Sequence, residues 1–185
     1  MEIKGTAVLT IQNFVKHANK GLYNEWVNLL PQASKEIFSN EIYPNQWYDV
    51  LYAAVEPSKA IGKMFYNNDE QKAAFESGRY SATQALTGIY KFFVKAASPG
   101  FIITRASYVF ATYYRPCTMK VLEKADKAVQ LRLDSDGPHC EVVQQRIAGW
   151  MERGLEISGC ANIKIDIPKS IAKGDAFTQF SIKWA

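Results

Sequence analysis

The residues best suited to chemistry are a histidine and a cysteine that follow each other, His139 and Cys140, in a loop before a long helical pattern. A cysteine at a helix N-terminus beside a histidine is in surroundings that favour a thiolate. A nucleophilic thiolate also needs a third group that orients the histidine. The sequence shows no Asp or Asn placed for that role, so we expect a loop histidine, a buried thiol and no enzymatic reaction.

The same two residues are weak candidates for metal ligands. The chain has three cysteines, Cys117, Cys140 and Cys160, which lie 23 and 20 residues apart. These spacings fit no ordinary ligand pattern, and no Cys-x-x-Cys pair occurs. We therefore predict that no metal is bound.

An aromatic cluster is the strongest candidate for a binding site. Residues 108–115 read Tyr-Val-Phe-Ala-Thr-Tyr-Tyr-Arg. Together with aromatic residues of two helices, this segment could wall an apolar cavity between helices and a sheet, although a plain hydrophobic core would use the same residues. Arg115 at the rim could meet a ligand carboxylate, or stabilise a helix end. The candidate pocket residues are Tyr90, Phe93, Phe110, Tyr113, Tyr114, Arg115 and Trp150.

The composition narrows the class of protein. Of 185 residues, 48% are hydrophobic and 22% are charged, which suits a folded chain with a real core. The net charge of +4 is scattered and not gathered in a stripe, so we expect no nucleic-acid partner. No apolar run approaches the roughly 18 residues of a membrane span. With no signal-peptide pattern at the start, we expect a cytoplasmic protein with reduced thiols.

The elements that must position these residues fall into two groups. Residues 6–98 carry helical apolar stripes, whereas residues 99–185 predict helix, hairpin, helix and hairpin. The first hairpin is expected over residues 118–133. The last alternates Ile163, Ile165 and Ile167 with polar residues, and then Phe180, Ile182 and Trp184. We predict an α+β fold in one domain, with a helical N-terminal half packed against an antiparallel sheet of two hairpins separated by a long helix.

Within the helical half, three boundaries are predicted. Trp47, Leu51, Ala54 and Val55 indicate a helix that ends at Pro57, after which Ser58 would cap a new one. Two more helices are expected over residues 70–80 and 83–97.

The C-terminal half resembles a known family. Pro138-His139-Cys140, the helix glycines Gly149 and Gly154, the pair Gly174-Asp175, and Phe180 are similar in order to the 4-vinyl reductase domain. That domain belongs to a superfamily with heme nitric-oxide/oxygen-binding domains and certain TRAPP-complex subunits. The resemblance covers mainly residues 99–185, and uncharacterised bacterial members of myxobacterial type look most similar.

The resemblance also indicates what the chain lacks. The family pattern has cysteines where Ser170 and Thr178 stand, so a zinc site built from thiolates would lose ligands here. The heme-binding branch uses a histidine on a mid-chain helix and a Tyr-x-Ser-x-Arg motif, and this motif is absent from the sequence. The only histidines are His17 and His139, while Tyr90 lies near the expected ligand position.

We therefore predict a protein without a cofactor, with heme and zinc disfavoured. Its expected function is a non-enzymatic module that binds or senses a small apolar or aromatic molecule. Two alternatives remain open: an interaction module that forms a homodimer, as in TRAPP subunits, and a heme-based gas sensor.

Overall fold

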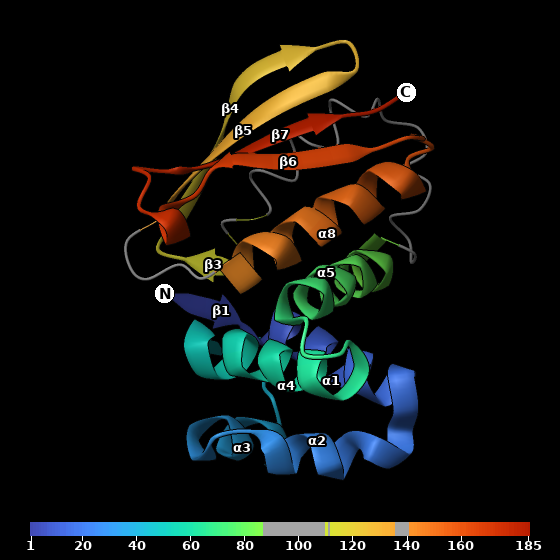
Figure 1. Ribbon diagram of the computed structural model, residues 1–185. Helices are drawn as coiled ribbons and strands as arrows, with labels where there is room; N and C mark the ends of the chain where they lie inside the picture. The colour runs from blue at the N-terminus through green and yellow to red at the C-terminus, as the bar shows by residue number, and fades with distance from the viewer. Residues whose placement is uncertain (87–109, 111, 136–140) are drawn as a thin grey trace.

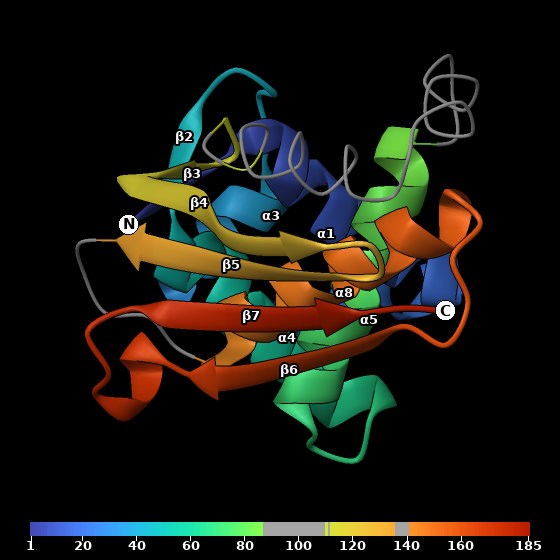
Figure 2. The same ribbon diagram turned by 90° about the horizontal axis from the view of Figure 1, so that it is seen from above.

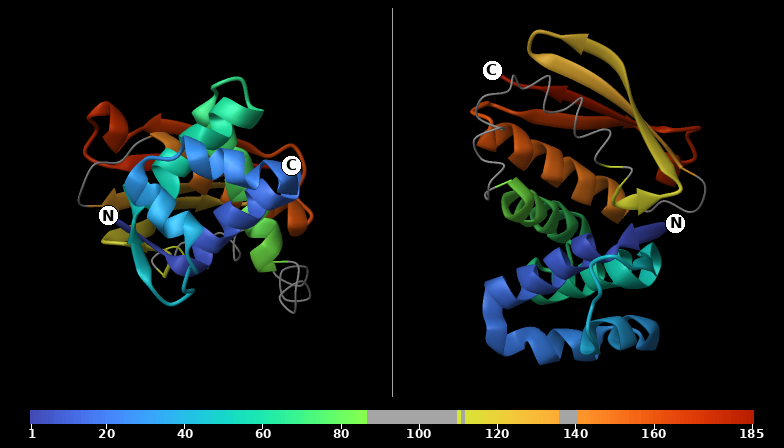
Figure 3. Two further views of the ribbon diagram at one scale, coloured as in Figure 1. Left: turned by 90° about the horizontal axis from the view of Figure 1, so that it is seen from below. Right: turned by 180° about the vertical axis from the view of Figure 1, so that it is seen from behind.

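The computed structural model describes residues 1–86, 110, 112–135 and 141–185. Its elements form layers, with a sheet on one side, α8 and α5 beneath it, and the N-terminal helices farthest away (Figures 1 and 3). The described α-helices are α1 (Gly5–Asn19), α2 (Tyr23–Leu29), α3 (Gln32–Ser39), α4 (Glu56–Phe65), α5 (Glu70–Leu86) and α8 (Glu141–Ile157). Short 3-10 segments cover Lys20–Leu22 and Ile171–Lys173, and a π-helical segment covers Leu51–Val55.

The strands form two antiparallel sheets. The larger has the order β4-β5-β7-β6, which Figure 2 shows from above. Its strands are β4 (Cys117–Ala125), β5 (Ala128–Ser135), β6 (Lys164–Lys169) and β7 (Thr178–Lys183). The smaller sheet has the order β2-β1-β3, with strands β1 (Glu2–Lys4), β2 (Trp47–Asp49) and β3 (Tyr114–Arg115). The α+β fold with two hairpins around a long helix is therefore confirmed.

Alternation of side chains explains why one face of the large sheet is buried. Val129 pairs with Ile182 and Leu131 with Phe180, and all four side chains are almost completely buried. Because side chains of a strand alternate between faces, the polar residues between them point to the other side. Helix α8 covers the apolar face (Figure 1).

Helices α5 and α8 pack with their backbones in close contact. A side chain at Gly78 would overlap the carbonyl oxygen of Arg146, and one at Gly149 would overlap the carbonyl oxygen of Phe75. Only glycine allows this approach, since it has no Cβ. The two glycines thus fix how α8 lies on α5 and where the side chains of its inner face end.

The small sheet was not expected from the sequence. Strand β1 joins β2 on one side and β3 on the other, so the start of the chain meets residues more than one hundred positions later. Trp47 lies in β2 and not in a helix, because its neighbours pair with β1 before the π-helical segment begins. Two- and three-residue strands carry too little alternation to be recognised in a sequence.

The three predicted helix boundaries were wrong. Pro57 does not end a helix, because the π-helical segment Leu51–Val55 continues directly into α4 and Pro57 is the second residue of α4. Ser58 is fully buried inside that helix and makes no capping bond. Residues 70–80 do not form a separate helix either, because α5 continues to Leu86. The remainder of the helix predicted over 83–97 lies outside the described residues.

Candidate functional site

A cavity of about 40 Å³ lies where α1, α5, α8 and the segment around β3 meet. Its walls are mostly apolar, with a few polar groups from α5 and α8 among them. The lining residues are Ala7, Ser81, Phe110, Tyr113, Tyr114, Arg146, Ile147, Trp150 and Met151. The cavity thus brings together parts of the chain from both ends and from the middle.

Four of the residues predicted for a pocket line this cavity: Phe110, Tyr113, Tyr114 and Trp150. The rings of Phe110 and Tyr114 stack with centroids 4.8 Å apart and planes inclined by 16°. Tyr90 and Phe93, also predicted for the pocket, lie outside the described residues, as do His139 and Cys140.

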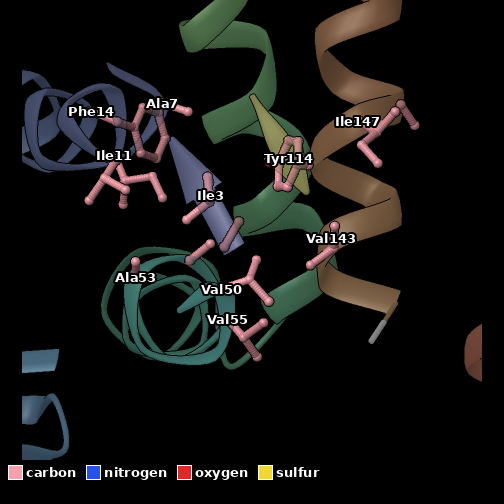
Figure 4. Packing of buried hydrophobic residues seen from close by; sticks show 14 of the residues in the cluster. Ile3, Ala7, Ile11, Phe14, Val50, Ala53, Val55, Tyr114, Val143 and Ile147 are labelled. Carbon is pink, nitrogen blue, oxygen red and sulfur yellow. The ribbon is translucent and has the colours of Figure 1, made fainter. Parts of the chain in front are cut away.

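The small sheet and α8 explain how the lining is positioned. Tyr114 pairs with Ile3 of β1, and the N–H of Lys4 donates a hydrogen bond to the carbonyl oxygen of Tyr113 at 2.8 Å. Figure 4 shows Tyr114 pointing into the core, with Ile3 and Ile147 near it. On α8, residues 146, 147, 150 and 151 follow the three- and four-residue spacing that places side chains on one helix face.

Arg115 does not line the cavity. Strand alternation turns it to the opposite side from Tyr114, and its side chain is 50% exposed. Its Nε lies 2.6 Å from a carboxylate oxygen of Glu2, and its guanidinium stacks 4.2 Å from the ring centre of Trp47. Arg115 therefore joins β3 to β1 and β2 at the surface.

The arginine that does line the cavity is Arg146, which the sequence reasoning missed. It is only 4% exposed. Nη1 donates to Ser77 Oγ at 2.5 Å, and Nη2 donates to Thr10 Oγ1 at 2.9 Å and to the Ala7 carbonyl at 3.2 Å. A signal was present in the sequence, since Arg146 interrupts the apolar positions Val143, Ile147 and Trp150 of the same helical stripe.

The cysteines offer no reactive centre in the described part of the chain. Burial raises the pKa of the Cys117 thiol to about 11, and its Sγ lies 3.2 Å from the Tyr114 carbonyl oxygen. A thiol with this pKa is protonated at neutral pH and is a poor nucleophile. Cys160 Sγ lies 3.7 Å from Ser158 Oγ. Within the described residues, no three His, Cys, Asp or Glu side chains converge to hold a metal ion.

Ser170 and Thr178, the positions of the family's cysteines, do lie together. Gln144 of α8 donates to Thr178 Oγ1 at 2.9 Å and accepts from Ser170 Oγ at 2.8 Å, and all three side chains are buried. The Ile171 N–H also donates to Thr178 Oγ1 at 3.2 Å. Neutral partners satisfy these hydroxyls, so the position holds a hydrogen-bonded link between α8 and the last hairpin.

The fold as a whole is similar to solved structures of H-NOX proteins. One, the Fe(II) unliganded protein from K. algicida, has a TM-score of 0.69 and 15% identity, over 99% of this chain and 97% of that chain. Another, from S. oneidensis in the Fe(II)NO ligation state, has a TM-score of 0.70 and 12% identity, over 99% of both chains. An oxygen-binding H-NOX domain related to soluble guanylate cyclases, solved as its oxygen complex, has a TM-score of 0.65 and 12% identity, over 98% of this chain and 95% of that chain. No known family model and no curated protein matches the chain.

The expectation of a protein without a cofactor is contradicted by these similarities. Proteins that share this fold along nearly the whole chain were solved with ferrous iron, and one is described in a study of heme distortion in the H-NOX family. The H-NOX part of the superfamily resemblance is thereby supported at the level of fold. None of the described helices has the length and apolar character needed to cross a membrane.

Proposed function

We propose that this protein is a heme-dependent sensor module for a small gaseous ligand, without an enzymatic reaction of its own. The observation that carries the proposal is the likeness of nearly the whole chain to H-NOX proteins solved as ferrous, nitric-oxide and oxygen complexes. A bound heme would supply a ferrous iron to which a diatomic gas can bind. The chain's own residues would supply the walls around that gas.

The size of the cavity favours a gas over an aromatic ligand. A void needs roughly 10–15 Å³ by this measure to hold one water molecule, and an engineered cavity that binds benzene measures about 150 Å³. At about 40 Å³, the cavity has room for two or three atoms of second-row size. A diatomic molecule fits, and an aromatic ring does not.

The cavity is too small to hold a heme itself, so a heme would lie against its walls, and the described residues fit one in part. Trp150, Tyr113 and Phe110 form an apolar aromatic wall of the kind that packs against a flat macrocycle. His17 is not placed to ligate an iron at this cavity. It is exposed and packs against Tyr80. At 1.5 Å per residue, it lies about 15 Å along α1 from Ala7, which lines the cavity. Tyrosine and methionine also ligate heme iron. Tyr113 and Met151 line the cavity. Tyr90, predicted to lie near the iron-ligand position, is outside the described residues.

Titration of hemin into heme-free, full-length protein tests the proposal. We expect one equivalent to bind and produce a Soret band that shifts when the reduced sample receives nitric oxide. Trp150→Ala should weaken hemin binding about tenfold through lost aromatic contact, whereas Phe177→Ala, the loss of a half-buried aromatic ring away from the lining, should leave it unchanged. Absence of stoichiometric hemin binding would refute the proposal.

The iron ligand is tested by the same spectra. Because His17 lies far from the cavity, we expect the His17→Ala protein to keep its Soret band and its nitric-oxide response. The same spectra are recorded for the His139→Ala variant, which tests the other histidine of the chain as the iron ligand. Loss of the band in the His17 variant would show that the heme lies near His17 and not against the walls of the cavity.

We also propose that the protein is cytoplasmic, bacterial and able to form a homodimer. The support for the location is the odd number of cysteines without a Cys-x-x-Cys pair, and the support for a bacterial origin and a dimer is the superfamily resemblance. Light scattering of the heme-loaded protein at several concentrations tests the dimer. A mass that stays that of the monomer at all concentrations would rule out the homodimer.

A further inference from the structure

The cavity contains a buried positive charge that no described acid balances. Arg146 lines the cavity and is 4% exposed, yet it takes part in none of the ion pairs formed by the described residues. Its partners there are two hydroxyls and one carbonyl, all neutral. A guanidinium carries five N–H donors, so at least two have no acceptor in the described part of the chain.

The acidic residues of α8, the helix that carries Arg146, are committed elsewhere. Glu152 and Glu156 bind Arg79, and Glu141 at the start of the helix lies 3.0 Å from Lys173. Helix α5 contributes the hydroxyls of Ser77 and Ser81 on the cavity side. A buried charge without a counter-ion is costly, and arginine keeps its charge in proteins. An anion in the cavity would remove that cost.

The volume of the cavity limits the size of such an anion. With room for two or three water-sized groups, it suits a monoanion of two or three heavy atoms and excludes bulky carboxylates. Ser81 adds a hydroxyl to the lining, and the burial of Arg146 strengthens a hydrogen bond from its guanidinium to an anion.

We propose that Arg146 forms a binding subsite for a small monoanion in this cavity. The inference rests on the cavity and its charge, and not on the heme proposed above. It gives the site a preference that a purely apolar pocket would lack, since two ligands of equal size would be distinguished by charge.

Formate and formamide provide the test, because both have three heavy atoms and only formate is charged. Each is titrated into heme-free, full-length protein at constant ionic strength, with calorimetry and thermal unfolding as readouts. Formate should bind at least about tenfold more tightly than formamide and raise the midpoint of unfolding, as expected for a charge-assisted hydrogen bond. Equal effects of both compounds, or no binding of formate, would overturn the proposal.

Variants of two arginines on the same helix complete the test. Arg146→Met should reduce formate binding to the level of formamide, and Arg146→Lys, which keeps the charge, should retain part of it. The control is Arg153→Met, whose parent side chain hydrogen-bonds Thr83 and Glu156 and does not line the cavity. Formate binding that persists in Arg146→Met, or that is lost equally in Arg153→Met, contradicts the assignment. If Arg146→Met does not fold, the formate–formamide pair on the unaltered protein and the lysine variant still decide.

Discussion

Two arginines at the interface of α5 and α8 have opposite surroundings. Arg79, on the partly exposed flank, binds the carboxylates of Glu152 and Glu156, and Arg153 donates to Glu156 as well. Arg146, in the interior, has only neutral acceptors among the described residues. Among the described residues, the charges of the flank are paired, whereas the guanidinium of Arg146 has no carboxylate partner. The paired cluster links α5 to α8, and the buried charge of Arg146 beside the cavity is the basis of the anion subsite proposed above.

The largest effect is expected from changes that push the two helices apart. Gly78→Ala and Gly149→Ala each place a Cβ against a backbone carbonyl oxygen of the facing helix. We expect each to lower the free energy of unfolding by about 3 kcal/mol or more, because backbone must shift. Chemical denaturation with urea measures this change.

Gly154→Ala is the matched control for these two variants. The atoms nearest to a Cβ at this position are side-chain carbons 3.6 and 3.7 Å away, which is ordinary contact. Alanine should therefore be neutral or stabilise α8 by about 0.5–1 kcal/mol. Equal loss of stability in all three variants would show that the close approach of the helices does not set their packing.

Replacing each arginine by methionine separates the two environments. Arg79→Met leaves Glu152 without its arginine and Glu156 with Arg153 alone, and should cost about 1 kcal/mol, less at high salt because these ion pairs are partly exposed. Arg146→Met removes an unbalanced buried charge and fills its space with an apolar chain, so stability should stay constant or rise. Urea denaturation at low and high salt measures both. A larger loss in Arg146→Met than in Arg79→Met would contradict the distinction drawn between the two sites.

The smallest expected effect is a change in the free energy of unfolding at acid pH, caused by protonation of Glu156. Burial would raise the pKa of the Glu156 carboxyl, but hydrogen bonds from Arg79 and Arg153 outweigh it and hold the pKa below its ordinary value of 4.5. Because the pKa of this carboxyl is lower in the folded than in the unfolded state, its ionised form stabilises the fold fully at pH values above the unfolded pKa. This stabilisation is lost as the pH falls through the folded pKa. We expect the Arg79→Met protein to lose about 0.5 kcal/mol less than the unaltered protein on acidification below pH 4.5. If the free energy of unfolding changed equally with pH in both proteins, the Arg79–Glu156 pair would not contribute to stability.

Much of the fold was predictable from the sequence because long alternating or helical patterns repeat one physical requirement many times. Strands β5 and β7 alternate over six or more residues, and the apolar stripe of α8 spans four turns. Strands β1 and β3 have three and two residues and gain their stability from each other, across most of the chain. Only folding reveals such a pairing.

The candidate site was predictable in its aromatic part and not in its charged part. Phe110, Tyr113, Tyr114 and Trp150 were recognised as large apolar surfaces that must be buried together. Arg115 was chosen for its position next to them, although alternation in a strand turns it away. Arg146 was overlooked because a charged residue within a helical stripe is usually read as the edge of the polar face.

The most direct test of the central claim is the heme content of the protein purified from cells supplied with a heme precursor, measured as the pyridine hemochrome per chain. We expect about one heme per chain, with a ferrous spectrum that changes on addition of nitric oxide. A protein that is isolated without heme from such cells, and that stays unchanged when hemin is added, would contradict it.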